Sequence, residues 1–159
     1  MAQTTAAIPQ SGFKLEVSLD NSTWTDISGS AATVEVGGGE AQIGEQMTAD
    51  GEYPIVTAGQ KIAPYDITCR CVYTETSLQP WKLVSANFYS GTKTIYLRWS
   101  PAGGAIGTQR FTASKDGASA ALVPITSCNP PALDASSGDP ALFEFSVRSP
   151  AILEATISS

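Results

Sequence analysis

The strongest constraint in this sequence is an alternation of apolar and polar residues that recurs along the chain. From Phe13 to Leu19, and again from Tyr65 to Tyr73, every second residue is apolar and those between are mostly polar or charged. Such alternation is typical of β-strands with one buried face. Shorter runs that favour strands lie at 31–36, 95–99, 110–114, 120–126, 143–147 and 151–157. The chain is therefore predicted to be mainly β, a β-sandwich or small barrel.

One segment, Ser77–Ser90, instead has apolar residues at helical spacing. Ser77 is a candidate N-cap, Pro80 lies in the first turn and Gly91 follows the last residue. These residue types are common at those positions of a helix. The sequence thus predicts one α-helix flanking the β-structure.

Two connections are informative. Asp116-Gly117, between 110–114 and 120–126, predicts a β-hairpin.

The stretch Gly37–Gly59 contains six glycines and little periodicity, which indicates a long Gly-rich loop. Long loops inside compact domains are commonly functional. We expect a single domain, 1–159, with residues 1–10 as an N-terminal arm.

Residue types needed for catalysis are scarce. The chain has no histidine, which excludes Ser-His-Asp and Cys-His nucleophilic sites. Cys69 and Cys71 share a strand face and are poorly placed to pair, and with Cys128 they do not have the spacing of a zinc site. Trp24, Trp81 and Trp99 are expected in the core. The sequence predicts no enzyme, no cofactor and no metal site.

Charge is unevenly distributed in a chain of net charge −6. Residues 16–60 hold eight acids and no base, whereas residues 61–115 hold seven bases and two acids. An acidic chain is poorly suited to gripping nucleic acid or an anionic membrane. Segregated charge suits head-to-tail contact between copies, although ordinary solvated faces explain it as well.

Several segments resemble the major tail proteins of long, non-contractile (siphovirus-type) bacteriophage tails. They are Trp-Thr-Asp-Ile at 24–27, the run 53–59 leading into 65–75, Tyr-Leu-Arg-Trp-Ser-Pro at 96–101, and Phe-Glu-Phe at 143–145. The similarity follows the element order over nearly the whole chain, while no single motif is diagnostic.

This resemblance implies a tail tube protein. Its fold would be a β-sandwich with a helix at its side, and its sheets would join between subunits of a hexameric ring into a tube-lining β-barrel. Stacked rings would conduct double-stranded DNA without binding it specifically. A tape measure protein and tail tip and terminator proteins would be partners, in a virion tail assembled in the host cytoplasm.

We expect two roles for the acidic segment. Glu16 and Glu35 are candidates for lining the lumen, where carboxylates repel phosphates; the alternative is that they face outward. The loop is the candidate for contact between rings, through Gly37, Gly38, Gly39, Glu40, Glu45, Asp50 and Glu52. The competing function is a secreted carbohydrate-binding or adhesin-type β-sandwich, although Met1–Gln10 lacks the pattern of a signal peptide.

Overall fold

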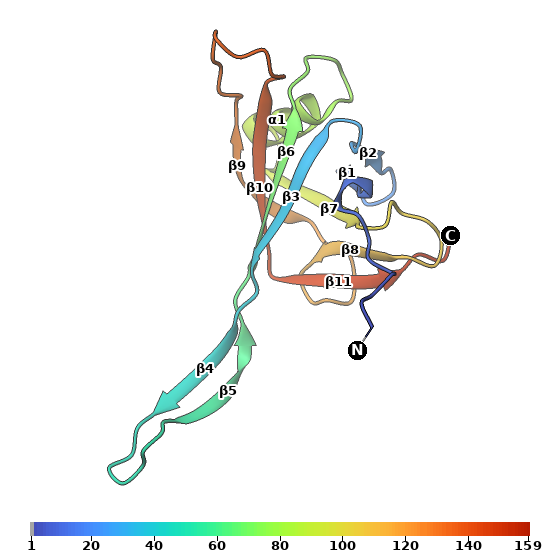
Figure 1. Ribbon diagram of the computed structural model, residues 1–159. Coiled ribbons are helices and arrows are strands. Elements are labelled where there is room, and N and C mark those ends of the chain that lie inside the picture. Colours follow the sequence, from blue (N-terminus) through green and yellow to red (C-terminus); the bar gives the residue numbers. More distant parts are fainter. Residues whose placement is uncertain (1) are drawn as a thin grey trace.

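The computed structural model describes residues 2–159, so Met1 of the expected N-terminal arm lies outside the described part. Within it, a 3₁₀ turn at Gln10–Gly12 precedes eleven strands and one α-helix, arranged as Figure 1 shows. The strands are β1 Lys14–Ser18, β2 Thr25–Asp26, β3 Ala31–Gly38, β4 Ala41–Gln46, β5 Ile55–Ile62, β6 Tyr65–Val72, β7 Thr94–Ser100, β8 Gln109–Ser114, β9 Val123–Asn129, β10 Leu142–Ser149 and β11 Ala151–Thr156, and the helix is α1 Pro80–Ser90.

The strands of the body form two crossing layers. One layer has the antiparallel order β3-β6-β10-β9, and the other contains β1, β7, β8 and β11 (Figure 1). Strand β7 connects them, because Thr94 and Ile95 pair with β9 while Arg98 and Trp99 pair with β8. The prediction of a mainly β fold with a flanking helix is confirmed.

The alternating residues meet in the core. Its fully buried side chains come from both layers and include Leu15, Ile67, Cys69, Cys71, Ile95, Leu97, Phe143, Phe145 and Val147. Each buried aliphatic or aromatic side chain of this size contributes about 1.5–3 kcal/mol relative to an exposed one. Cys69 and Cys71 are unpaired and share the core face of β6, as predicted.

Helix α1 covers the core near β9. Trp81 packs edge-to-face on Phe143 at 5.2 Å between ring centroids, and Val84 is fully buried. The predicted N-terminal cap is wrong: the N-cap is Gln79, not Ser77, and it makes no side-chain capping bond. Pro80 at the first helical position sets the start instead. Within residues 2–159, no helix is long and apolar enough to span a membrane.

The prediction of an irregular loop over Gly37–Gly59 is wrong. This stretch contains the end of β3, all of β4 and much of β5, and β4 and β5 pair as an antiparallel hairpin that projects from the body (Figure 1). All residues of β4 and β5 are exposed. A strand without a buried face need not show the periodicity by which half-buried strands are recognised.

The prediction of a hairpin at Asp116-Gly117 is right for the turn and wrong for the pairing of the strands that flank it. The turn itself is present, with Gly117 at φ +76° and the Asp116 carboxylate accepting the N–H groups of Ala118 and Ser119. Its two sides are joined by one bridge, Ser114 to Ala120, and by the hydrogen bond from Ala121 N–H to the Ala113 carbonyl. Strand β8 pairs with β11 and β7, and β9 pairs with β10 and β7, because packing between distant segments overrides the local turn signal.

Candidate assembly surfaces

The thiols have no reactive character. Burial raises the pKa of Cys71 to about 12 and that of Cys128 to about 11, and it also raises the pKa of Cys69. They therefore remain protonated near neutral pH. In residues 2–159, no group of three or more His, Cys, Asp or Glu side chains is placed to hold a metal ion.

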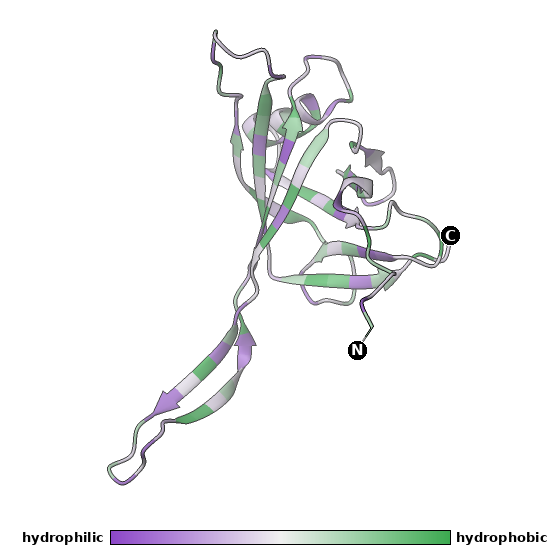
Figure 2. Cartoon of the chain, viewed as in Figure 1, coloured by the Kyte–Doolittle hydropathy of each residue, from purple (hydrophilic) through white to green (hydrophobic). Residues whose placement is uncertain are grey.

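The β4–β5 hairpin has two unlike faces. Register pairs Ile43 with Ala58 and Glu45 with Val56, and paired residues lie on the same face. By alternation one face, here called the apolar hairpin face, carries Ala41, Ile43, Val56, Ala58 and Ile62 around the single charge of Glu45. Its large side chains are 58–63% exposed, and Figure 2 shows hydrophobic segments on both strands. A two-stranded ribbon with an uncovered apolar face is at best marginally stable alone.

The residues expected to contact another ring are spread along this ribbon. Gly37 and Gly38 end β3, Gly39 and Glu40 form the junction, and Glu45 lies in β4. Asp50 and Glu52 lie in the tip between β4 and β5. From residue 40 to residue 62 there are four carboxylates and one lysine, so the hairpin is strongly acidic.

The junction between the body and the hairpin depends on two glycines. Gly38 and Gly39 both have positive φ, +78° and +70°, a conformation that other residues rarely adopt. A Cβ atom at Gly39 would also overlap the ring of Tyr65. Two backbone hydrogen bonds cross here, from Gly39 N–H to the Pro64 carbonyl at 3.3 Å and from Ala63 N–H to the Glu40 carbonyl at 2.9 Å.

Strand β3 is a terminal strand of the sheet and exposes hydrogen-bonding groups. The Gly39–Pro64 bond continues the β3–β6 register, so Glu35 and Gly37 direct their backbone groups toward β6. Val34 and Val36 therefore direct their N–H and C=O groups away from β6. In the described part of the chain, no strand pairs with β3 on that side. Such an edge is a template for pairing with another chain.

An open groove of about 690 Å³ runs beside this edge. Ala32 to Glu35 form one wall, and Ile8 to Ser11 form the other. Phe13, Trp99 and Pro101 complete a mostly apolar lining. The groove thus leaves space along the exposed backbone of β3.

The solvent face of the β3-β6-β10-β9 layer is polar; we call it the polar sheet face, consisting of Glu35, Asp66, Thr68, Arg70, Glu144, Ser146 and Arg148. Its arginines are paired across strands, Arg70 Nε to Glu144 Oε2 at 2.8 Å and Arg148 Nε to Asp66 Oδ1 at 2.9 Å. The hydrogen bond from Arg148 lowers the pKa of Asp66. Glu35 is exposed here and has no ion pair within 4.0 Å among the described residues.

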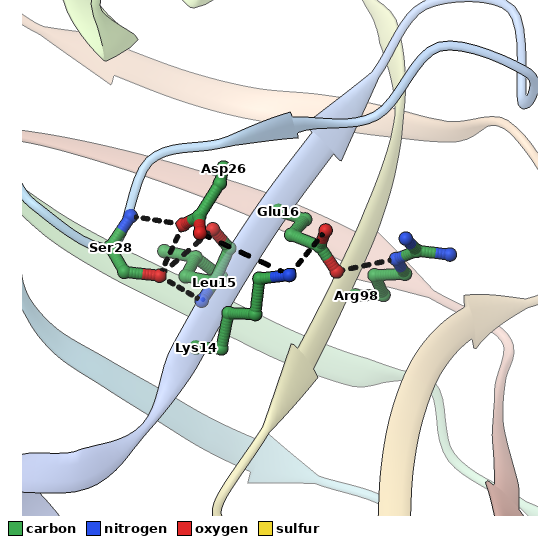
Figure 3. Close-up of polar contacts among 6 residues, drawn as sticks. All are labelled: Lys14, Leu15, Glu16, Asp26, Ser28 and Arg98. Atoms are coloured by element: carbon green, nitrogen blue, oxygen red, sulfur yellow. Dashed lines mark hydrogen bonds and ion pairs between the residues drawn. The ribbon is translucent and has the colours of Figure 1, made fainter. Parts of the chain in front are cut away.

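Glu16 lies in the other layer and is 7% exposed (Figure 3). Its carboxylate accepts a hydrogen bond from Arg98 Nε at 2.7 Å and forms an ion pair with Lys14 Nζ at 3.1 Å. Arg98 in turn lies 4.0 Å from the ring centroid of Trp24, a cation–π contact. Burial alone would raise the pKa of Glu16, but the bonds from Arg98 and Lys14 outweigh it and lower the pKa.

The structure therefore does not bring Glu16 and Glu35 together. Sequence reasoning also missed the partners of Glu16 and the exposed edge at Val34 and Val36. Neither had a usable sequence signal, because both depend on which strands become neighbours. Trp81 and Trp99 pack in or against the core as predicted, whereas Trp24 is half-buried beside Arg98.

No family model and no curated protein matches this sequence. Solved structures do match over nearly the whole chain. The SPP1 tail tube has a TM-score of 0.68 at 13% identity, over 96% of this chain and 81% of that one. The sheath/tube terminator of an extracellular contractile injection system, PVC, has 0.64 at 16%, over 97% and 100%. The tail of an empty GTA particle, computed with C6 symmetry, has 0.61 at 12%, over 99% and 100%. This chain therefore has a tail-tube-like fold.

Proposed function

We propose that this chain is the structural subunit of a tail tube of the siphovirus type, built from stacked hexameric rings. The observation that carries the proposal is the match of fold over nearly the whole chain to tail and tube proteins. Two features of the chain support it: the apolar hairpin face lacks a partner within the described chain, and β3 exposes an unpaired edge. Contacts with further copies would cover both, and no catalytic role is required.

The bore in this proposal is lined by the polar sheet face. Joining β3-β6-β10-β9 layers side by side would make a continuous barrel with this face exposed to the lumen and the core face covered. The face carries three carboxylates, of Glu35, Asp66 and Glu144, against two arginines that are already ion-paired. A weakly acidic lining with no free cation would let double-stranded DNA pass without binding, since such binding depends on Lys and Arg contacts to phosphates. Glu16, buried and paired with two cations, would contribute little to it.

The partners of this chain would be further copies of itself, a tape measure protein within the bore, and tip and terminator proteins at the ends of the tube. The site of action would be the virion tail, after assembly in the host cytoplasm. We infer no membrane binding by this chain.

Electron microscopy of the concentrated protein tests the proposal. Tubes with a regular axial repeat are expected, and reconstruction should place Glu35 at the bore. Persistent monomers that bind sugars would instead support the secreted carbohydrate-binding or adhesin-type function. A basic bore would contradict DNA conduction without binding.

A hairpin deletion gives the first specific prediction. Replacing Ala41–Ile62 by Asn-Gly joins residues that are already adjacent, because Ala63 N–H bonds to the Glu40 carbonyl. The variant should remain a folded monomer with an unchanged melting temperature, since the core does not include the hairpin. Sedimentation at concentrations where the parent chain polymerises should find no polymer; normal tubes would refute the role of the hairpin in contact between rings.

A further inference from the structure

Leu78 has an unfavourable backbone conformation. Its φ is +64°, and its side chain is 71% exposed in the loop between β6 and α1. A bulky residue in the left-handed region is strained, and strained residues are concentrated at functional sites. Leu78 also borders a groove of about 210 Å³ formed with Ile27, Ser30 and Pro80 among others. An exposed, strained leucine beside a groove suits a contact with another molecule.

The loop that carries Leu78 lies at the α1 end of the molecule, opposite the projecting hairpin (Figure 1). The β9–β10 loop reaches the same end and presents Leu133, which is 82% exposed. The two ends of the subunit thus both expose apolar side chains, and a translated copy brings one end to the other. Such a heterologous contact repeats without limit along an axis.

The two ends of the subunit differ in charge. The hairpin from residue 40 to residue 62 holds four carboxylates and one lysine. The α1 end carries charges of both signs: Lys82 lies on α1, Glu75 lies in the Leu78 loop, and Asp134 and Asp139 lie in the β9–β10 loop. Lys82 is exposed on α1, seven residues after Glu75. Two hairpin ends brought together would repel each other through their carboxylates, so contact between unlike ends is favoured over contact between hairpin ends.

We propose that the apolar hairpin face of one copy docks on the α1 end of the next copy, against Leu78 and Leu133. This inference rests on the proposed function and names the receiving surface that the hairpin contacts. The strain at Leu78 is then tolerated because that conformation directs an apolar side chain toward the incoming hairpin.

Leu78→Gly separates this role from folding. Glycine adopts positive φ freely, so the melting temperature should stay the same or rise, while the critical concentration for polymerisation should rise at least tenfold. Asn21→Gly is the matched control: Asn21 also has positive φ, +63°, is exposed and is uncharged. This control should polymerise like the parent chain. Normal polymerisation of Leu78→Gly would overturn the proposal.

Disulfide cross-linking between two differently tagged copies tests the contact directly. Copies with Ile43→Cys are mixed with copies with Leu78→Cys and oxidised, and a cross-linked heterodimer is expected. Thr57→Cys, on the opposite hairpin face, should not cross-link to Leu78→Cys. The native cysteines do not interfere, because all three are buried.

The outcomes distinguish failure of this docking inference from failure of the proposed function. If hairpin deletion abolishes tubes but neither Leu78 variant has an effect, the hairpin contacts another surface and this inference fails while the proposed function stands. If the deletion variant still forms tubes, the hairpin role fails as well. Equal cross-linking from Ile43→Cys and Thr57→Cys would also overturn the assignment of the docking face.

Discussion

At the scale of single residues, the ion-pair network of Glu16, Arg98 and Lys14 is expected to matter most for stability. Glu16 and Arg98 are both largely buried, with side chains 9% and 18% exposed. Their charges compensate each other on strands that lie next to each other in the sheet, and Lys14 adds a second cation. Removing one partner of such a pair leaves a desolvated charge without compensation.

We therefore expect Glu16→Ala to lower the free energy of unfolding by about 3–5 kcal/mol. Chemical denaturation at pH 7 measures the loss. Glu154→Gln on β11 is the control, since Glu154 is exposed, and its effect should stay within about 0.5 kcal/mol. Equal losses in both variants would show that the network is not stabilising.

The same network has a pH dependence with a defined sign. The pKa of Glu16 is lower in the folded chain, so its stabilisation is complete above the unfolded pKa of about 4.3 and is lost as pH falls through the folded value. Between pH 5 and pH 3, the unfolding free energy of Glu16→Gln should therefore fall less steeply than that of the parent chain. Parallel slopes would contradict this assignment.

At the scale of elements, the sequence predicted those whose partners lie in the core. Strands β1, β6, β7 and β10 and the end of α1 at Gly91 were expected because burial of one face leaves a periodic pattern. The hairpin β4–β5 was missed because neither of its faces is buried, and the pairing of β8 with β11 because a local turn does not determine distant neighbours. Likewise the sequence located the acidic candidates but not their environments. Which residues of β3 direct their N–H and C=O groups away from β6 depends on the alternation of hydrogen bonds between these two strands. Residue types do not encode this alternation, here called the hydrogen-bond phase.

That phase gives a prediction for β3. Val36→Pro removes an N–H group that points away from β6, so the monomer should stay folded while lateral joining of copies is lost, as judged by electron microscopy. Val36→Thr keeps the N–H group and should form tubes.

The adjacent substitution tests the phase itself. Glu35→Pro removes an N–H group directed toward β6 and should lower the melting temperature of the monomer markedly more than Val36→Pro. The reverse order would show that the phase is assigned incorrectly.

At the scale of the whole molecule, the subunit has two unlike ends, an acidic hairpin at one and α1 at the other. Contacts between exposed charges weaken when salt shortens the Debye length, which falls from about 10 Å at 0.1 M to about 3 Å at 1 M. The critical concentration for polymerisation should therefore rise several-fold over this range, measured by sedimentation. The variant Glu45→Gln, Asp50→Asn, Glu52→Gln should lose most of this salt dependence; an unaltered dependence would place the relevant charges elsewhere.

The glycine junction has a mechanical consequence. Among residues 2–159, two chain segments and two backbone hydrogen bonds at the junction connect the hairpin to the body, and Gly38 and Gly39 give that connection torsional freedom. We therefore expect the hairpin to swing without disturbing the core, as at other hinges where a few residues absorb the change in backbone angle. We expect filaments of this subunit to be pliant, taking up curvature at each stacking step while the packed body stays rigid.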